Sequence, residues 1–168
     1  CKAYQDFVEN IQPQIAPVAD QLNRKAFESV FLNELTTEPG YDILIRNLKK
    51  DIEIFKEENV PLFTEISTET QKYAQLSGAM MVEISGQEMT LQQASVLLLS
   101  TERSKREEAY HKISVRRLQD KVTLNDLFTK LIGLRHQVSV NAGFSNFRDY
   151  MFKAYGRFDY TPKDCFNF

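Results

Sequence analysis

Apolar side chains recur every three or four residues along most of this 168-residue chain. That spacing puts them on one face of an α-helix, whereas a half-buried strand would need alternation at every second residue. The first such stripe runs from Tyr4 to Val30 and passes Pro13 and Pro17, which we expect to divide or kink the segment. The periodicity therefore predicts an all-α fold.

Cap and turn residues divide the rest of the chain into further helices. Thr90 with Gln93, and Ser104 with Glu107, have the spacing of a capping box, and Gly143 is placed to end a helix. Helices are expected over residues 41–58, 60–78, 90–99, 104–118, 124–143 and 145–155. Such segments can bury their apolar faces only against one another, so we expect a bundle or array of antiparallel helices.

One short segment departs from the helical period. Between residues 79 and 89 the apolar side chains alternate, with Met80, Val82 and Ile84 on one face, and Ser85–Gly86 can form a tight turn. We expect a β-hairpin near residues 79–89 that packs on helices, because an isolated hairpin is marginally stable. Residues 1–168 are predicted to form a single helical domain or fragment.

Charge and hydropathy exclude several classes of protein. With 21 basic and 23 acidic side chains and a pI of about 5.8, the chain has no overall positive field that would attract nucleic acid. No apolar run reaches the roughly 18–20 residues of a membrane span. Two cysteines, Cys1 and Cys165, are too few for a disulfide framework and favour a reducing, cytoplasmic compartment. We expect neither nucleic acid nor membrane as a partner.

The most basic stretch is Thr101–Lys121, which holds seven basic and four acidic residues. It could contact nucleic acid or an acidic partner. Glu102 and Arg106 are spaced to pair on a helix, however, and few aromatic side chains interleave the charges. A solvated helix face explains the stretch better.

No pattern of residues predicts a self-contained active site. The two histidines lie on different predicted helices, and neither is followed by Glu, since Lys112 follows His111 and Gln137 follows His136. The sequence has no Cys-x-x-Cys pair, no Gly-x-Ser-x-Gly turn and no glycine-rich phosphate loop. We expect no catalytic, cofactor-binding or metal-binding residue in this chain.

Aromatic residues crowd the last 25 positions, which contain nine of the 19: Phe144, Phe147, Tyr150, Phe152, Tyr155, Phe158, Tyr160, Phe166 and Phe168. Burying one such side chain stabilises by about 1.5–3 kcal/mol, so leaving most of them in water is implausible. The helix over 145–155 is apolar most of the way round, and Thr161–Pro162 is a helix start. We expect this end to pack against protein outside the sequence, and Cys1 in place of Met indicates a cloning or processing boundary.

Several strings resemble the oligoendopeptidase F branch of the thimet-oligopeptidase-like zinc metallopeptidases. The similar strings are KKDIEIFKEENVPLF at 49–63, GAMMVEISGQEMTLQQASVLLLSTERSKR at 78–106, then LNDLF, LIGLRHQ, NAGF, RDYMF and RFDYTP between 124 and 162. They keep one order and cover roughly three quarters of the chain, while residues 1–40 match less distinctively.

The resemblance implies the N-terminal, non-catalytic part of an enzyme that cleaves oligopeptides in a deep channel between two helical halves. The family carries its zinc on a His-Glu-x-x-His helix whose Glu polarises the attacking water. This sequence has no such motif, so no ligand or catalytic residue transfers to its numbering. The implied partners are a C-terminal catalytic domain holding the zinc, and an oligopeptide substrate. Whether Arg135 or His136 approaches the channel stays open.

A second interpretation is a free-standing helical domain that binds a partner protein through its aromatic end. The absence of a catalytic constellation favours it. On the first interpretation we expect the isolated chain to be inactive as a peptidase and to self-associate through its aromatic end, where the missing protein would leave an apolar patch exposed.

Overall fold

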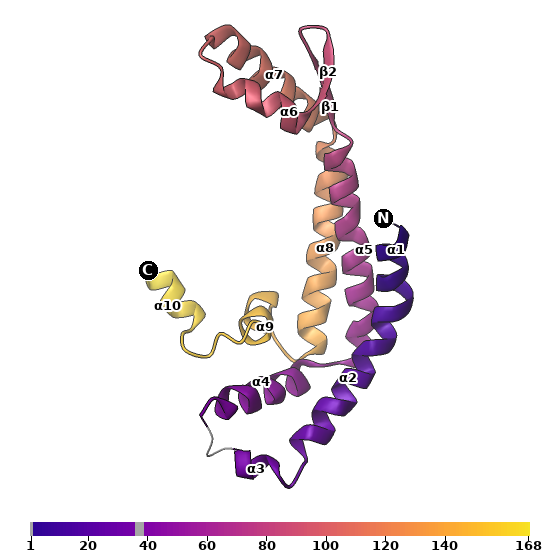
Figure 1. Cartoon of the computed structure of the whole chain (residues 1–168), viewed down its shortest axis with the longest axis vertical. Helices are drawn as coiled ribbons and strands as arrows, with labels where there is room; N and C mark the ends of the chain where they lie inside the picture. Colours follow the sequence, from indigo (N-terminus) through magenta and orange to yellow (C-terminus); the bar gives the residue numbers. More distant parts are fainter. Residues whose placement is uncertain (1, 36–38) are drawn as a thin grey trace. The chain divides into compact units, whose positions relative to one another are not determined.

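A computed structural model describes residues 2–35 and 39–168 (Figure 1). Cys1 lies outside the described residues, as does Glu38, the first residue of the turn that Glu38-Pro39-Gly40 predicts. The elements in order are α1 Lys2–Asp6, the π-helical η1 Phe7–Ile11, α2 Gln12–Phe27, α3 Leu32–Leu35, α4 Tyr41–Ile54, the 3-10 turn η2 Glu57–Asn59, α5 Val60–Gly78, β1 Met81–Ile84, β2 Gln87–Thr90, α6 Leu91–Val96, the 3-10 turn η3 Leu97–Leu99, α7 Arg103–Gln119, α8 Lys121–Asn141, α9 Phe147–Ala154 and α10 Pro162–Asn167. The predicted all-α class with one small hairpin is confirmed. Across the described ranges, no helix is long and apolar enough to cross a membrane.

The chain forms two compact units, Cys1–Thr68 with Ile132–Phe168, and Glu69–Leu131. The first unit contains α1 to α4, α9, α10 and one end each of α5 and α8. The second contains the hairpin, α6, α7 and the other ends of α5 and α8. That residues 1–168 act as one domain of a larger protein stays a prediction.

In the first unit, the prolines change the helix locally without ending it. Gln12 donates its backbone N–H to the Phe7 carbonyl, a π-helical bond immediately before Pro13. Pro13 has no N–H to donate to the previous turn, and a wider turn accommodates that loss. Pro17 lies inside α2, which continues to Phe27.

The helix expected over 41–58 ends four residues early. Phe55 and Lys56 are extended, with ψ angles of 129° and 125°, and the Phe55 N–H caps α4 by donating to the Asp51 carbonyl. The sequence predicted a longer helix because Phe55 is apolar and lies at helical spacing from the apolar residues before it. The extended backbone instead directs that ring between helices, which helps to form the cavity described below.

A buried asparagine joins the start of α5 to the end of α8. Asn59 is 1% exposed; its Nδ2 donates to the Val138 carbonyl at 3.0 Å, and its Oδ1 accepts from Asn141 Nδ2 at 2.8 Å. In the second unit, the buried Glu69 of α5 accepts from Lys130 of α8 at 2.7 Å. Both pairings match the predicted antiparallel packing of neighbouring helices.

The second unit packs the hairpin, α6 and α7 around one core. β1 and β2 pair antiparallel with Ile84 opposite Gln87, so that Ser85–Gly86 forms the two-residue loop. The buried core consists of Met80, Val82, Ile84, Leu91, Ala94, Ala109 and Ile113. The expected face of Met80, Val82 and Ile84 is therefore the buried one, and the hairpin prediction is confirmed.

The expected cap at Thr90 and the expected helix end at Gly143 agree with the structure. Thr90 and Gln93 form a complete capping box at α6, and Gly143 and Gly156 follow α8 and α9 with φ angles of 83° and 65°. The expected capping box at Ser104 is wrong. α7 begins at Arg103 with Glu102 before it, so Ser104 lies inside the first turn and cannot cap it.

Candidate functional site

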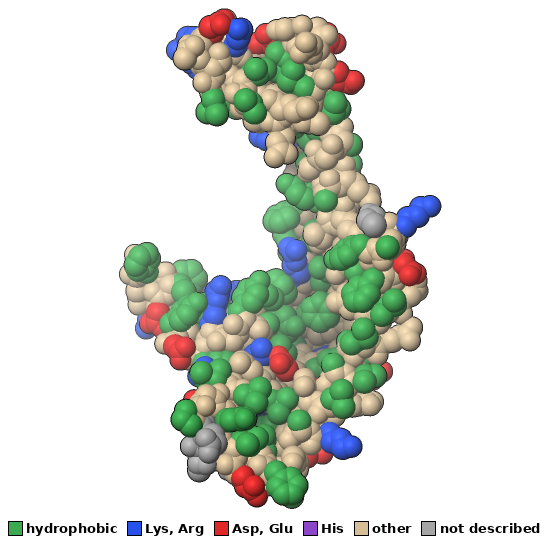
Figure 2. All heavy atoms as spheres, in the orientation of Figure 1, with side chains coloured by type: hydrophobic (Ala, Val, Ile, Leu, Met, Phe, Trp, Pro, Cys, Tyr) green, Lys and Arg blue, Asp and Glu red, His purple; other side chains and the backbone are tan. Residues whose placement is uncertain are grey.

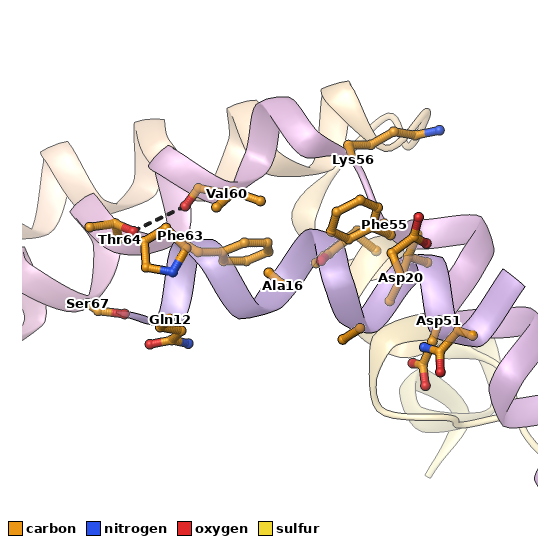
Figure 3. A pocket seen from close by; sticks show the side chains of 15 residues that line it. Gln12, Ala16, Asp20, Asp51, Phe55, Lys56, Val60, Phe63, Thr64 and Ser67 are labelled. Carbon is orange, nitrogen blue, oxygen red and sulfur yellow. Dashed lines mark hydrogen bonds between the residues drawn. The ribbon is translucent and has the colours of Figure 1, made fainter. Parts of the chain in front are cut away.

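A cavity of about 410 Å³ lies in the first unit between α2, the junction from α4 to α5, and α9 (Figure 3). Its wall combines apolar side chains with a few polar groups. The lining side chains drawn and labelled in Figure 3 are Gln12, Ala16, Asp20, Asp51, Phe55, Lys56, Val60, Phe63, Thr64 and Ser67. A concave, mainly apolar site with few polar groups is typical of small-ligand binding.

The α2 wall follows from helical spacing. Ala16, Ala19, Asp20 and Asn23 are three or four residues apart and therefore share one face of the helix, which lines the cavity. The two alanines leave space there because their side chains end at Cβ. Phe55 and Phe63 supply aromatic rings from the opposite elements.

Asp20 is the most unusual polar group of this wall. Its side chain is 10% exposed, and its Oδ2 accepts from Arg24 Nε one turn later at 2.7 Å. The same bond raises the pKa of the Arg24 guanidinium. Its other oxygen, Oδ1, is buried and has no hydrogen-bond partner in the described part of the chain.

One ion pair and one hydrogen bond hold α9 against α4 beside the cavity. Lys153 of α9 pairs with Glu53 of α4 and lowers the pKa of that carboxyl. Lys50 donates to the Ala154 carbonyl at 3.3 Å. These contacts place Tyr150, which is 5% exposed, at the cavity wall, and burial raises the pKa of its hydroxyl.

The aromatic end is less buried than its composition predicts. Tyr150 is buried, and Phe144, Phe147, Phe152 and Phe158 are half-buried, whereas Tyr155, Tyr160, Phe166 and Phe168 are exposed. The expectation that most of these rings are shielded from water is therefore only partly met within this chain. Cations cover some of the faces: Arg46 lies 4.4 Å from the ring centre of Phe158, and Arg157 lies 5.0 Å from that of Phe152.

The two histidines and Cys165 are exposed. His111 lies on α7 of the second unit, with its ring edge-on to Tyr110 at 5.7 Å, and His136 lies on α8 within the first unit. Arg135 is half-buried, and Cys165 is a free, exposed thiol on α10. Among residues 2–35 and 39–168, no three His, Cys, Asp or Glu side chains are grouped closely enough to hold a metal ion.

Two ion pairs form in the basic stretch Thr101–Lys121. Arg116 pairs with Asp120 at 2.5 Å, and Glu102 pairs with Lys105 at 2.8 Å. The expected pair of Glu102 with Arg106 is not the one that forms. Arg106 instead donates to the Ser100 carbonyl at 2.7 Å, because the chain turns back towards it before α7 begins.

Sequence reasoning missed Asp20 and Phe55. An acidic residue beside Ala16 and Ala19 on one helix face was a usable signal for Asp20. No local signal marked Phe55, because its role depends on an extended backbone after α4.

No family model matches this sequence, and no curated protein matches it either. Its fold, however, matches solved structures closely. A structure from Bacillus anthracis str. Ames designated oligoendopeptidase F superposes with a TM-score of 0.87 at 23% identity, over 96% of this chain and 30% of that chain. The chain has the fold of a segment of oligoendopeptidase F.

Two further structures agree with this assignment of the fold. A second structure designated oligoendopeptidase F gives a TM-score of 0.87 at 22% identity, over 96% of this chain and 28% of that chain. PZ peptidase A, solved with an inhibitor, gives 0.86 at 21% identity over 96% of this chain and 29% of its own. This chain therefore spans less than a third of the oligoendopeptidase F fold, and the resemblance drawn from the sequence strings is confirmed at the level of the fold.

Proposed function

We propose that this chain is the N-terminal, non-catalytic part of an oligoendopeptidase F-like zinc metallopeptidase that hydrolyses oligopeptides in the cytoplasm. One observation carries the proposal: 96% of the chain superposes on these peptidase structures, yet covers only 30% of the first of them. In the proposed enzyme these helices form part of the wall of the substrate channel. The wall would restrict access to short, unfolded peptides.

The side chains described here do not fit a zinc site, because no group of three ligands is present among them. The zinc and its His-Glu-x-x-His helix would therefore belong to a C-terminal catalytic domain of the same protein. That domain is the proposed partner of this chain, and no step of peptide hydrolysis is assigned to the residues numbered here.

Reading the gene past the codon for Phe168 tests this proposal directly. We expect an open frame that reaches a His-Glu-x-x-His motif. The chain alone, with added zinc, should hydrolyse no fluorogenic oligopeptide, whereas co-expression with the downstream region should yield an activity that a metal chelator abolishes. Chelator-sensitive turnover by the pure 168-residue chain would contradict the assignment of a non-catalytic role.

The exposed apolar stripe of α1, η1 and α2 favours a second candidate, a helical domain that binds another protein. Figure 2 shows hydrophobic side chains grouped on the surface over these elements, and Ile15, Val18 and Leu22 are all more than half exposed. Exposed patches of this kind mark interaction surfaces. A stop codon directly after Phe168 would favour this candidate over the peptidase.

A further inference from the structure

The wall of the cavity includes the Asp20 carboxylate, one of whose oxygens is shielded from water and has no hydrogen-bond donor in the described part of the chain. The carboxylate is 10% exposed, and only its Oδ2 is bonded, to Arg24. Oδ1 is buried and unpartnered within the described residues, so Lys56, which also lines the cavity, does not satisfy it. An ionised carboxylate can accept several hydrogen bonds, and burying one of its oxygens without a donor is costly.

The groups around Asp20 favour a positive charge. The rings of Phe55 and Phe63 line the same cavity, and Figure 3 shows the Phe55 ring beside the Asp20 carboxylate. Aromatic faces attract cations, and a charged donor gives a carboxylate its strongest hydrogen bonds. A neutral hydroxyl would satisfy Oδ1 but would gain little from the rings.

The shape of the cavity favours an apolar stem behind that charge. Ala16 and Ala19 leave room along α2, and Val60 and Ile54 extend the apolar wall. The volume of about 410 Å³ is within the range of small-ligand sites. An ammonium or guanidinium group on a short hydrocarbon chain matches both the charged and the apolar parts.

We propose that this cavity binds an alkylammonium or alkylguanidinium group, with the Asp20 carboxylate turning to accept its hydrogen bond and the Phe55 ring covering its charge. The site is independent of peptide cleavage and goes beyond the function proposed above. The same chemistry occurs in a free amine and in the side chain of a lysine or arginine residue. The two sources are compared in the experiment below.

Calorimetric titration of the full 168-residue chain with n-pentylammonium chloride tests the site, with n-pentanol as the uncharged ligand of similar shape. We expect the amine to bind about tenfold more tightly than the alcohol. Asp20→Asn should weaken amine binding about tenfold and leave alcohol binding unchanged. Glu9→Gln removes an exposed negative charge from η1, outside the cavity wall and away from Arg24, and should change neither.

Two more variants keep the proposal testable if Asp20→Asn fails to fold, which circular dichroism would show. Arg24→Gln removes the cation that competes for Asp20 and should tighten amine binding several-fold, an effect that a purely structural role for Asp20 does not predict. Ala16→Leu fills the cavity and should abolish binding of both ligands.

Titration with an N-acetyl-lysine methylamide separates the two sources of the cation. Tighter binding than n-pentylammonium would assign the site to a peptide-borne side chain, and weaker binding would assign it to a free amine. Equal affinity for pentanol and pentylammonium, or no loss in Asp20→Asn, would overturn the proposal. Because no readout involves hydrolysis, such a failure would leave the proposed peptidase function unaffected.

Discussion

Ser85 has a φ of 53° in the loop of the hairpin, next to Gly86 at 77°. A two-residue hairpin loop of type I′ requires positive φ at both positions, and Asn adopts that conformation more readily than Ser. Ser85→Asn should therefore raise the free energy of unfolding by a few tenths to about 1 kcal/mol. Ser85→Val should lower it by about 1 kcal/mol, since β-branched residues avoid positive φ. Urea denaturation followed by circular dichroism measures both; an unchanged Val variant would contradict the turn assignment.

Glu69 makes the stability of the second unit depend on pH. Lys130 and Lys72 each donate to its carboxylate at 2.7 Å and hold the pKa of that carboxyl below its ordinary range. A lowered folded-state pKa means that the stabilisation is fully present above about pH 4.3, the unfolded value, and is lost as the pH falls through the folded value.

Replacing Glu69 by Gln removes the negative charge that both lysines bind and should reduce the free energy of unfolding by about 1–2 kcal/mol at pH 7. The loss should be no larger, because both lysines are half exposed and can bond to water instead. The difference from the wild type should shrink in urea titrations below about pH 4. Glu107→Gln, an exposed change on α7 of the same unit, is the control and should lie within about 0.5 kcal/mol of the wild type. A difference for Glu69→Gln that stays constant down to pH 3 would contradict the ion-pair explanation.

At the scale of elements, the two sequence-predicted capping boxes give opposite predictions. The Thr90 hydroxyl accepts a hydrogen bond from the Gln93 N–H at 3.2 Å, so Thr90→Ala should lower the free energy of unfolding by about 1 kcal/mol. Ser104 lies inside the first turn of α7, so Ser104→Ala should be neutral or slightly stabilising, because alanine has the higher helix propensity. Thermal denaturation of the two variants compares them directly. An equal loss of stability in both would indicate that Ser104 does cap α7.

The sequence predicted the helices themselves, but it did not predict where several of them begin or end. The stripes of α5 and α8 and the glycines after α8 and α9 carry local signals, since periodicity and positive φ depend on nearby residues only. The early end of α4 at Ile54 has no such signal. Phe55 is extended in a structure where its ring packs between distant helices, so tertiary packing outweighs its helical phase.

At the scale of the whole molecule, exposed apolar surface dominates the expected behaviour. The stripe on α1, η1 and α2 contains Tyr4, Phe7, Ile11, Ile15, Val18 and Leu22, all between 43% and 63% exposed. A chain with this surface should self-associate as its concentration rises. Ile15→Lys with Leu22→Lys should reduce association without unfolding the chain, because both side chains already face water.

Light scattering over a concentration series measures that association. Tyr155→Ser with Phe166→Ser, at the exposed part of the aromatic end, is the matched comparison and should have the smaller effect because it removes less contiguous apolar surface. A wild-type chain that remains monomeric at high concentration would contradict the prediction for both surfaces.

The all-α class, the hairpin and the resemblance to oligoendopeptidase F were readable from the order of residues, because they depend on local spacing and on strings a few residues long. The cavity was not. Its walls come from α2, from the α4–α5 junction and from Tyr150. These parts lie as far apart in the sequence as Gln12 and Tyr150 and meet only after the helices pack. Likewise, only the folded chain buries the Asp20 oxygen without a partner. Burial depends on which residues pack around a group, and sequence spacing does not specify them.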